Sequence, residues 1–285
     1  MPFRRRGRPG HTRALPAAAL VSLTALAAHA GPAAAQERPF TTARPWTLAP
    51  GAVRVETGAR MAFDREIPLS GLTGDLFELR ATAIVGIASG VEGRIEGAGW
   101  QRMAVESRDP SAPFADKLDF DDASTSDATD VTLAARLRLA GADAPLTTAL
   151  QIGVRLPNAG NESGLGRDVT DALASLLAGW RSGPLSAAAE AGFAILGSPT
   201  QRAAQNDQGR LGLLIEVEPE AERLAVGAEV RRSFGDEAPG NELETELAVG
   251  GRVRLGGLWA DLAYRRRWAD GQGSNSVEVG LSHTF

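Results

Sequence analysis

The sequence contains no cysteine and a single lysine, and only 5% of its 285 residues are aromatic. Without cysteine, the chain can form no disulfide and no lipid-modified cysteine anchor. Nor does it contain a run of about 20 apolar residues, the length that a membrane-spanning helix needs. These absences argue against a disulfide scaffold, a lipoprotein and a helical membrane protein.

The first 35 residues predict a secretory signal peptide. Five arginines, from Arg4 to Arg13, precede an apolar run over 14–30, and small residues follow up to Ala35, after which we expect cleavage. The segment contains no acid, so its removal shifts the formal charge from −5 to about −10. A chain this acidic is not expected to bind nucleic acid.

Residues 36–50 predict an irregular periplasmic lead-in, because Pro39, Pro45 and Pro50 interrupt any strand there. From 51 to 285, apolar and polar residues alternate in segment after segment, which predicts an all-β, antiparallel up-and-down transmembrane β-barrel. Each segment is long enough to cross a bilayer at a tilt. The twelve expected strands are 51–63, 75–88, 91–107, 130–140, 145–157, 168–181, 184–196, 208–218, 222–234, 241–255, 257–268 and 275–285.

The connections between these segments alternate in length. Those at 89–90, 141–144, 182–183, 219–221 and 256 are short, and those at 64–74, 108–129, 158–167, 197–207, 235–240 and 269–274 are longer. Outer-membrane barrels have short periplasmic turns and longer extracellular loops. A soluble β-sandwich has no reason to sort its loops in this way, so the alternation favours a barrel in the outer membrane of a Gram-negative bacterium.

The chain from about Val53 to Phe285 resembles the outer-membrane transporter family associated with phenol degradation by the meta pathway. The similarity is concentrated in the strand, turn and strand over 81–96 (ATAIVGIASGVEGRIE), in 154–180 (VRLPNAG followed by GLGRDVTDALASLLAGW) and in the closing strand, which ends at Phe285. The resemblance implies a twelve-stranded barrel that transports small molecules. The chain departs from a transporter of hydrophobic compounds in carrying many charges on its expected inner face.

The polar side of each strand is expected to face the lumen. If that lumen is aqueous, its charges would pass polar solutes and set weak ion selectivity. If it is dry, they would pair and seal the barrel. The expected lumen-lining residues are Arg94, Glu96, Arg102, Arg136, Arg138, Arg155, Glu229, Arg231, Glu244, Glu246, Arg252, Arg254, Asp261, Arg265, Arg267 and Glu278.

The apolar side of the strands is expected to face lipid. Arg232, Phe234, Arg266 and Trp268 lie late in two outward-running strands and predict a girdle beside lipopolysaccharide phosphates. Phe285 ends the closing strand, and we expect the barrel assembly machinery to recognise it.

No catalytic site is predicted. His283 is the only histidine after the signal peptide, and the alternation puts Ser282 on the opposite face of the same strand. We expect no cofactor and no metal site. The acidic stretch over 116–130 could bind a divalent cation, but its spacing is not that of an EF-hand, and a solvated loop is the simpler interpretation.

These patterns predict an outer-membrane channel or transporter for the passive passage of small solutes, possible catabolic substrates among them. The alternative is a closed structural or surface-binding barrel whose salt-bridged lumen does not conduct. The expected partners are outer-membrane lipid and lipopolysaccharide, the assembly machinery and a small-molecule solute.

Overall fold

The computed structural model describes residues 37–285, apart from 98, 121–122, 143, 202–203, 221–222 and 270–271. The expected signal peptide over 1–35 therefore lies outside the described residues. Within the described part of the chain, no helix is long and apolar enough to span a membrane.

Most of the described chain is β-strand, because the alternation of apolar and polar residues suits a sheet with two chemically different faces. The strands are β1 (Val53–Ile67), β2 (Leu72–Ala88), β3 (Val91–Glu96), β4 (Trp100–Arg108), β5 (Ser124–Ala128), β6 (Val131–Ala140), β7 (Leu146–Leu156), β8 (Asp171–Ser182), β9 (Leu185–Gly197), β10 (Gln205–Glu220), β11 (Leu224–Gly235), β12 (Glu244–Leu255), β13 (Leu258–Ala269) and β14 (Gln272–Thr284).

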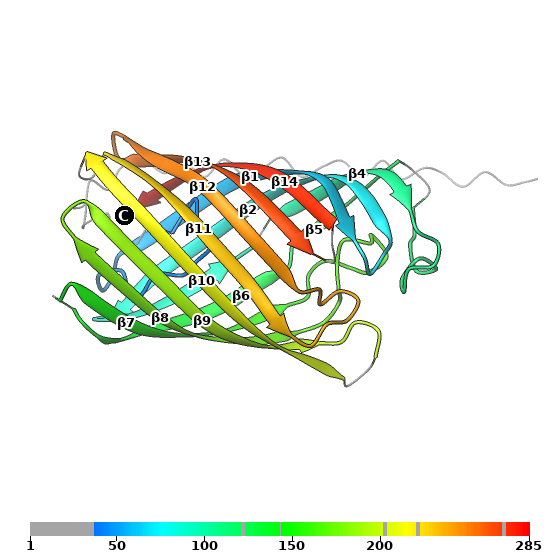
Figure 1. Cartoon of the computed structure of the whole chain (residues 1–285), viewed down its shortest axis with the longest axis horizontal. Coiled ribbons are helices and arrows are strands. Elements are labelled where there is room, and N and C mark those ends of the chain that lie inside the picture. The colour runs from blue at the N-terminus through cyan, green and yellow to red at the C-terminus, as the bar shows by residue number, and fades with distance from the viewer. Residues whose placement is uncertain are drawn as a thin grey trace, which may run out of the picture.

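These strands close into one antiparallel barrel (Figure 1). β1 pairs with both β2 and β14, so the sheet has no free edge along this seam. β3 and β4 pair with successive parts of β2. On their other side, β3 pairs with β6 and β4 pairs with β5. β3 with β4 and β5 with β6 each form one interrupted strand, and the prediction of a closed twelve-stranded barrel is confirmed.

The two ends of the barrel differ. We call the end that holds the connections 89–90, 183–184 and 256–257 the turn end, and the opposite end, with 109–123 and 157–170, the loop end. Gly90, with φ of 77°, has the left-handed backbone that a tight turn requires. The loops 64–74 and 269–274 expected from the sequence are shorter in the structure, because β1 runs on to Ile67 and β14 begins at Gln272.

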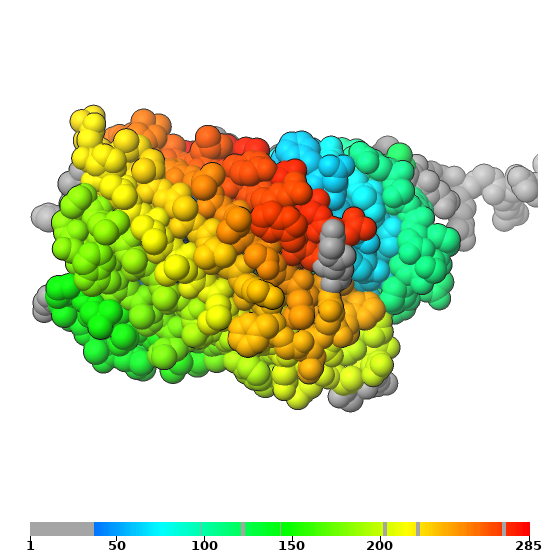
Figure 2. Space-filling model, viewed as in Figure 1, coloured from blue at the N-terminus to red at the C-terminus, as the bar shows by residue number. Residues whose placement is uncertain are grey.

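The wall is apolar outside and polar inside. Ile87 and Leu255 on the outer face are 63% and 59% exposed, whereas Arg136 and Glu92 on the inner face are buried. Figure 2 shows the outer side chains over β9–β14 as a closely packed surface. This inversion of a soluble protein is what a barrel in lipid requires.

The alternation of inward and outward side chains shifts by one residue between β3 and β4. On β3 the buried residues are Glu92 and Arg94, whereas on β4 they are Gln101 and Met103. Arg102 was predicted to line the lumen, and this prediction is wrong: it lies on the exposed outer face, where its guanidinium donates to Ser124. The irregular stretch after β3 moves each later residue to the opposite face of the sheet.

This shift predicts that charge reversal on β3 lowers the free energy of unfolding much more than charge reversal on β4. Arg94→Glu removes a guanidinium bound to Glu92 at 3.3 Å and Glu96 at 2.6 Å, and breaking buried pairs costs about 3–5 kcal/mol. Arg102→Glu, on the outer face, should change the free energy of unfolding by about 0.5 kcal/mol or less. Urea unfolding of the two refolded variants, followed by heat-modifiable gel migration, measures both. Equal losses would contradict the shift in the alternation.

Candidate functional site

The lumen is the candidate site, because fifteen of the sixteen residues predicted to line it do lie on the inner face. The exception is Arg102. The alternation of each strand places the others inward: Arg94, Glu96, Arg136, Arg138, Arg155, Glu229, Arg231, Glu244, Glu246, Arg252, Arg254, Asp261, Arg265, Arg267 and Glu278.

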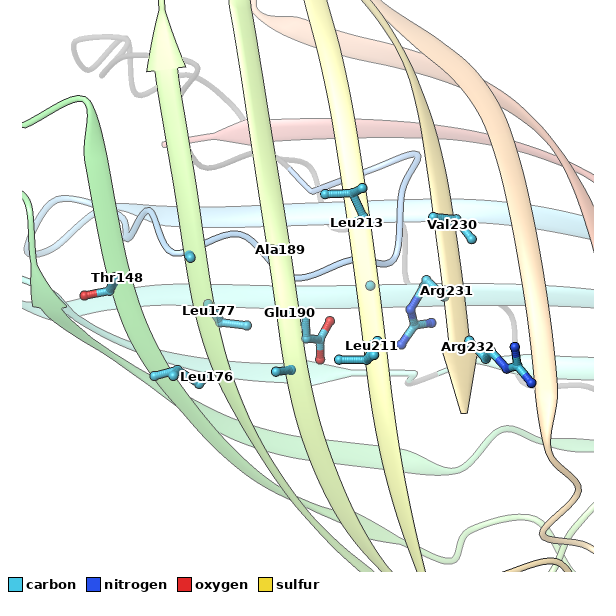
Figure 3. Close-up of a pocket in the computed structure, with 13 residues that line it drawn as sticks. Thr148, Leu176, Leu177, Ala189, Glu190, Leu211, Leu213, Val230, Arg231 and Arg232 are labelled. Carbon is cyan, nitrogen blue, oxygen red and sulfur yellow. The ribbon is translucent and has the colours of Figure 1, made fainter. Parts of the chain in front are cut away.

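The residues before β1 also lie in this lumen. The prolines of 36–50 predict a periplasmic lead-in, but residues 37–50, here called the luminal segment, run inside the barrel. Figure 3 shows this coil behind β8–β11, inside the wall. Its irregular backbone can lie there because the charged wall supplies partners for its amide and carbonyl groups.

Both charges at the start of the luminal segment pair with the wall. Glu37 forms ion pairs with Arg136, at 2.5 Å, and with Arg94. Burial acts to raise the pKa of Glu37, but the two guanidinium groups outweigh it and hold the pKa well below its ordinary value. Arg38 reaches the other side of the lumen and pairs with Glu278 at 2.7 Å and Asp261 at 3.1 Å.

Inner-wall carboxylates also accept hydrogen bonds from the backbone of the luminal segment. Glu229 accepts from the amides of Thr41, at 2.8 Å, and Thr42. Glu190 accepts from the amide of Ala43 at 3.0 Å. Glu229 was predicted to be a pore charge, but in the structure both carboxylates bind the backbone amides of a coil that has no secondary structure of its own.

Arg44 and Leu48 are two further contacts of the luminal segment with the wall. The guanidinium of Arg44 pairs with Glu216 on β10 at 2.8 Å, and both side chains are almost fully buried. The amide of Leu48 donates to Glu92 on β3 at 3.0 Å, and its side chain packs against Ile84. The luminal segment therefore contacts strands on opposite sides of the barrel and fills part of its cross-section.

Glycines on the inner face make room for this segment. A Cβ at Gly212 would lie 2.7 Å from the Thr42 hydroxyl, and one at Gly179 would lie 2.6 Å from the Pro45 ring. Gly86 likewise faces the carbonyl of Ala49, and Gly58 and Gly280 both face Arg38. Because these glycines come from several strands, together they form a groove shaped to the segment.

Arg265 is the centre of the ion-pair network beside the segment. Its guanidinium lies 2.8 Å from Glu246, 3.0 Å from Glu229 and 3.2 Å from Glu278, and it donates to the carbonyl of Pro39. Removal of this one side chain would leave three carboxylates facing one another.

Open space remains between the luminal segment and the loop end. A cavity of about 610 Å³ has Phe40 and Thr41 on one side and Leu69, Arg167 and Asn241 on another. Its lining combines arginines and carboxylates with several leucines. The luminal segment therefore occupies part of the lumen, and a cavity remains between it and the loop end.

The loops partly cover this cavity. The amide of Phe114 donates to Leu69 at 2.9 Å, and the amide of Asp119 donates to Glu162 at 3.0 Å. Ser70 donates to the carbonyl of Gly164 at 2.7 Å. Among the described residues, no group of three or more histidine or acidic side chains could hold a metal ion; Asp121 and Asp122 lie outside that description.

Three residues of the predicted girdle lie on the outer face near the loop end: Phe234, Arg266 and Trp268. Phe234 and Trp268 are exposed, and the guanidinium of Arg266 lies 5.6 Å from the Trp268 ring centroid. A hollow of about 430 Å³ lies over β7–β11. Figure 3 shows Leu176, Ala189 and Leu211 among the residues that line it. This hollow is apolar, as expected of a surface in contact with lipid.

The last strand holds no catalytic pair. Ser282 is buried on the inner side, whereas His283 stacks edge-on against Phe285 at 4.3 Å on the outer side and contacts the carbonyl of Gly257 at 2.8 Å. A nucleophile and its base must be within hydrogen-bond reach, and these two side chains point to opposite faces.

No family model and no curated protein matches the chain. Solved structures do. An outer-membrane channel from Pseudomonas putida F1 is 13% identical with a TM-score of 0.60, and the match covers 84% of this chain and 97% of that one. The NanC porin is 11% identical with a TM-score of 0.52, covering 80% of this chain and 98% of its own. At these identities the similarity shows that the chain shares the β-barrel fold of these two proteins.

Proposed function

We propose that this protein is an outer-membrane channel for the passive passage of small solutes. The observation that carries the proposal is a charge-lined lumen, with a cavity of about 610 Å³, enclosed by a wall that is apolar outside. Polar groups inside a barrel are the means by which such channels replace the hydration of a solute. The resemblance to the meta-pathway family makes small organic compounds of catabolism the first solutes to test.

The surface chemistry supports insertion in the outer membrane of a Gram-negative bacterium. Arg232 and Arg266, at the loop end, would contact lipopolysaccharide phosphates, with Phe234 and Trp268 at the interface. The assembly machinery would recognise the closing strand that ends at Phe285, whose amide and carbonyl bond to Val53 across the seam.

We infer that the luminal segment restricts this channel. Its contacts reach from β3 to β13, so a solute that crosses the lumen would meet it. Many of these contacts are ion pairs or hydrogen bonds to carboxylates, which water can replace when the segment leaves.

The same contacts favour a second candidate, a permanently closed structural barrel. Glu37, Arg38 and Arg44 all have charged partners, and a network this complete can hold the segment in place. The two functions differ in whether removal of the segment opens a pathway.

The first test is deletion of residues 37–47. It keeps the packing of Leu48 on Ile84 of β2 and the 2.8 Å hydrogen bond from the amide of Gly51 to the carbonyl of Gly86 on β2. In planar bilayers we expect discrete openings in the wild type and a several-fold larger unitary conductance in the deletion, because the obstruction is gone. Heat-modifiable migration checks that both proteins are folded. Folded wild-type and deletion proteins that both remain silent would overturn the channel and leave the structural barrel.

The second test uses the absence of cysteine. In the double variant Thr42→Cys and Gly212→Cys, the two Cβ atoms would lie 3.4 Å apart, close to the usual 3.5–4.5 Å of a disulfide. We expect the oxidised variant to conduct less than the same protein after reduction, because the disulfide holds the segment against β10. Each single cysteine variant is the control and should not respond to reductant. Equal conductance before and after reduction would mean that solutes pass without movement of the segment.

A further inference from the structure

One side of the cavity has an excess of positive charge. Arg155 on β7, Arg167 in the following loop, Arg210 on β10 and Arg231 on β11 all line it, and we call these four residues the arginine wall. Most other arginines around the cavity have a carboxylate of their own: Arg38 has Glu278 at 2.7 Å, and Arg80 has Glu78 at 2.7 Å.

Two members of the arginine wall share one acid. The carboxylate of Asp171 accepts from the Arg155 Nε at 2.6 Å and from the Arg167 Nη2 at 3.1 Å, and it also accepts from the amide of Gly197. A single carboxylate therefore faces two guanidinium groups, and the buried Nε of Arg167 has no hydrogen-bond partner among the described residues.

The other two members have no direct partner among the described residues. Arg210 and Arg231 form neither a hydrogen bond nor an ion pair there. The register explains this for Arg210, whose neighbours across the sheet are Gly192 and Ser233. Neither carries a charge. Arg155 and Arg231 repel Arg210, whereas Glu244 and Glu190 attract it from beyond ion-pair distance.

The acids nearest to this pair are bound elsewhere. Glu190 accepts from the amide of Ala43 and from Ser175 at 2.8 Å, and Glu244 accepts from Arg267. Glu246 lies 2.8 Å from Arg265. Figure 3 shows Glu190 and Arg231 flanking β10, where Gly212 provides no side chain between them.

A further unpartnered guanidinium lies at the edge of the same cavity. Arg65 on β1 has a buried Nη1 atom without a hydrogen-bond partner among the described residues. Arg267 repels its charge, and Glu244 attracts it. Buried arginines that face a cavity without partners are costly unless an anion joins them. The cavity also has apolar surface from Ile67, Leu165 and Leu196.

We propose that the arginine wall is a binding subsite for the carboxylate of a small amphipathic organic acid. The planar guanidinium fork matches a carboxylate, and the leucines beside it would cover the apolar body of the same molecule. This proposal rests on the channel function, because it names the class of solute that the cavity selects, but binding can be measured without conduction.

The test is calorimetric titration of the folded, detergent-solubilised full-length mature protein with hexanoate, with hexanamide and inorganic phosphate as parallel probes. Hexanoate should bind more tightly than either of the other two. In Arg210→Gln/Arg231→Gln the affinity for hexanoate should fall by at least about tenfold, the loss of one charge-assisted hydrogen bond. Among the described residues, no carboxylate lies within ion-pair distance of either arginine, so the substitution breaks no ion pair there, and folding should be retained.

Arg102→Gln is the matched control, because it removes one arginine from the outer face, and it should bind hexanoate like the wild type. Hexanoate affinity that is equal in the wild type and the double variant would overturn the subsite, as would tighter binding of phosphate or hexanamide. Binding without conductance would keep the subsite and remove the channel function. Conductance without binding would keep the channel function and overturn the subsite.

Discussion

The ion pairs between the luminal segment and the inner wall are the interaction on which this lumen depends. A barrel of twelve strands is too wide for its own side chains to fill completely. Glu37 adds a carboxylate to Arg94 and Arg136, which also pair with Glu92. Arg44 likewise adds a second guanidinium to Glu216, which also pairs with Arg252. The wall and the segment are therefore complementary parts of one polar core.

The barrel itself could be predicted from the sequence, because each strand separates lipid from a polar interior. That requirement imposes a period of two on residues such as Val277, Glu278 and Val279, and a period of two specifies which face each side chain occupies. Turns at Gly90 and Gly256 and the sorting of connections by length gave the strand number. The same rule correctly placed fifteen of the sixteen residues that were predicted to face inward.

Two features could not be predicted because they break that rule. The luminal segment has no period, and its prolines indicated only that it was not a strand. A signal was nevertheless present: Gly58, Gly179 and Gly212 all fall on inward positions, where a narrow groove would need them. Arg102 was misplaced because an irregular stretch shifts the alternation, and the charge of a residue does not show on which side of such a shift it lies.

The direct connection of the luminal segment to β1 constrains the order of assembly. Its residues precede β1 in the chain, yet Arg38 binds Asp261 and Glu278, which belong to the last two strands. The first part of the mature chain to be made therefore reaches its final place only when the last part is present. Insertion of the coil and closure of the seam between β1 and β14 are thus coupled, and a chain truncated before β13 would lack the acids that hold Arg38.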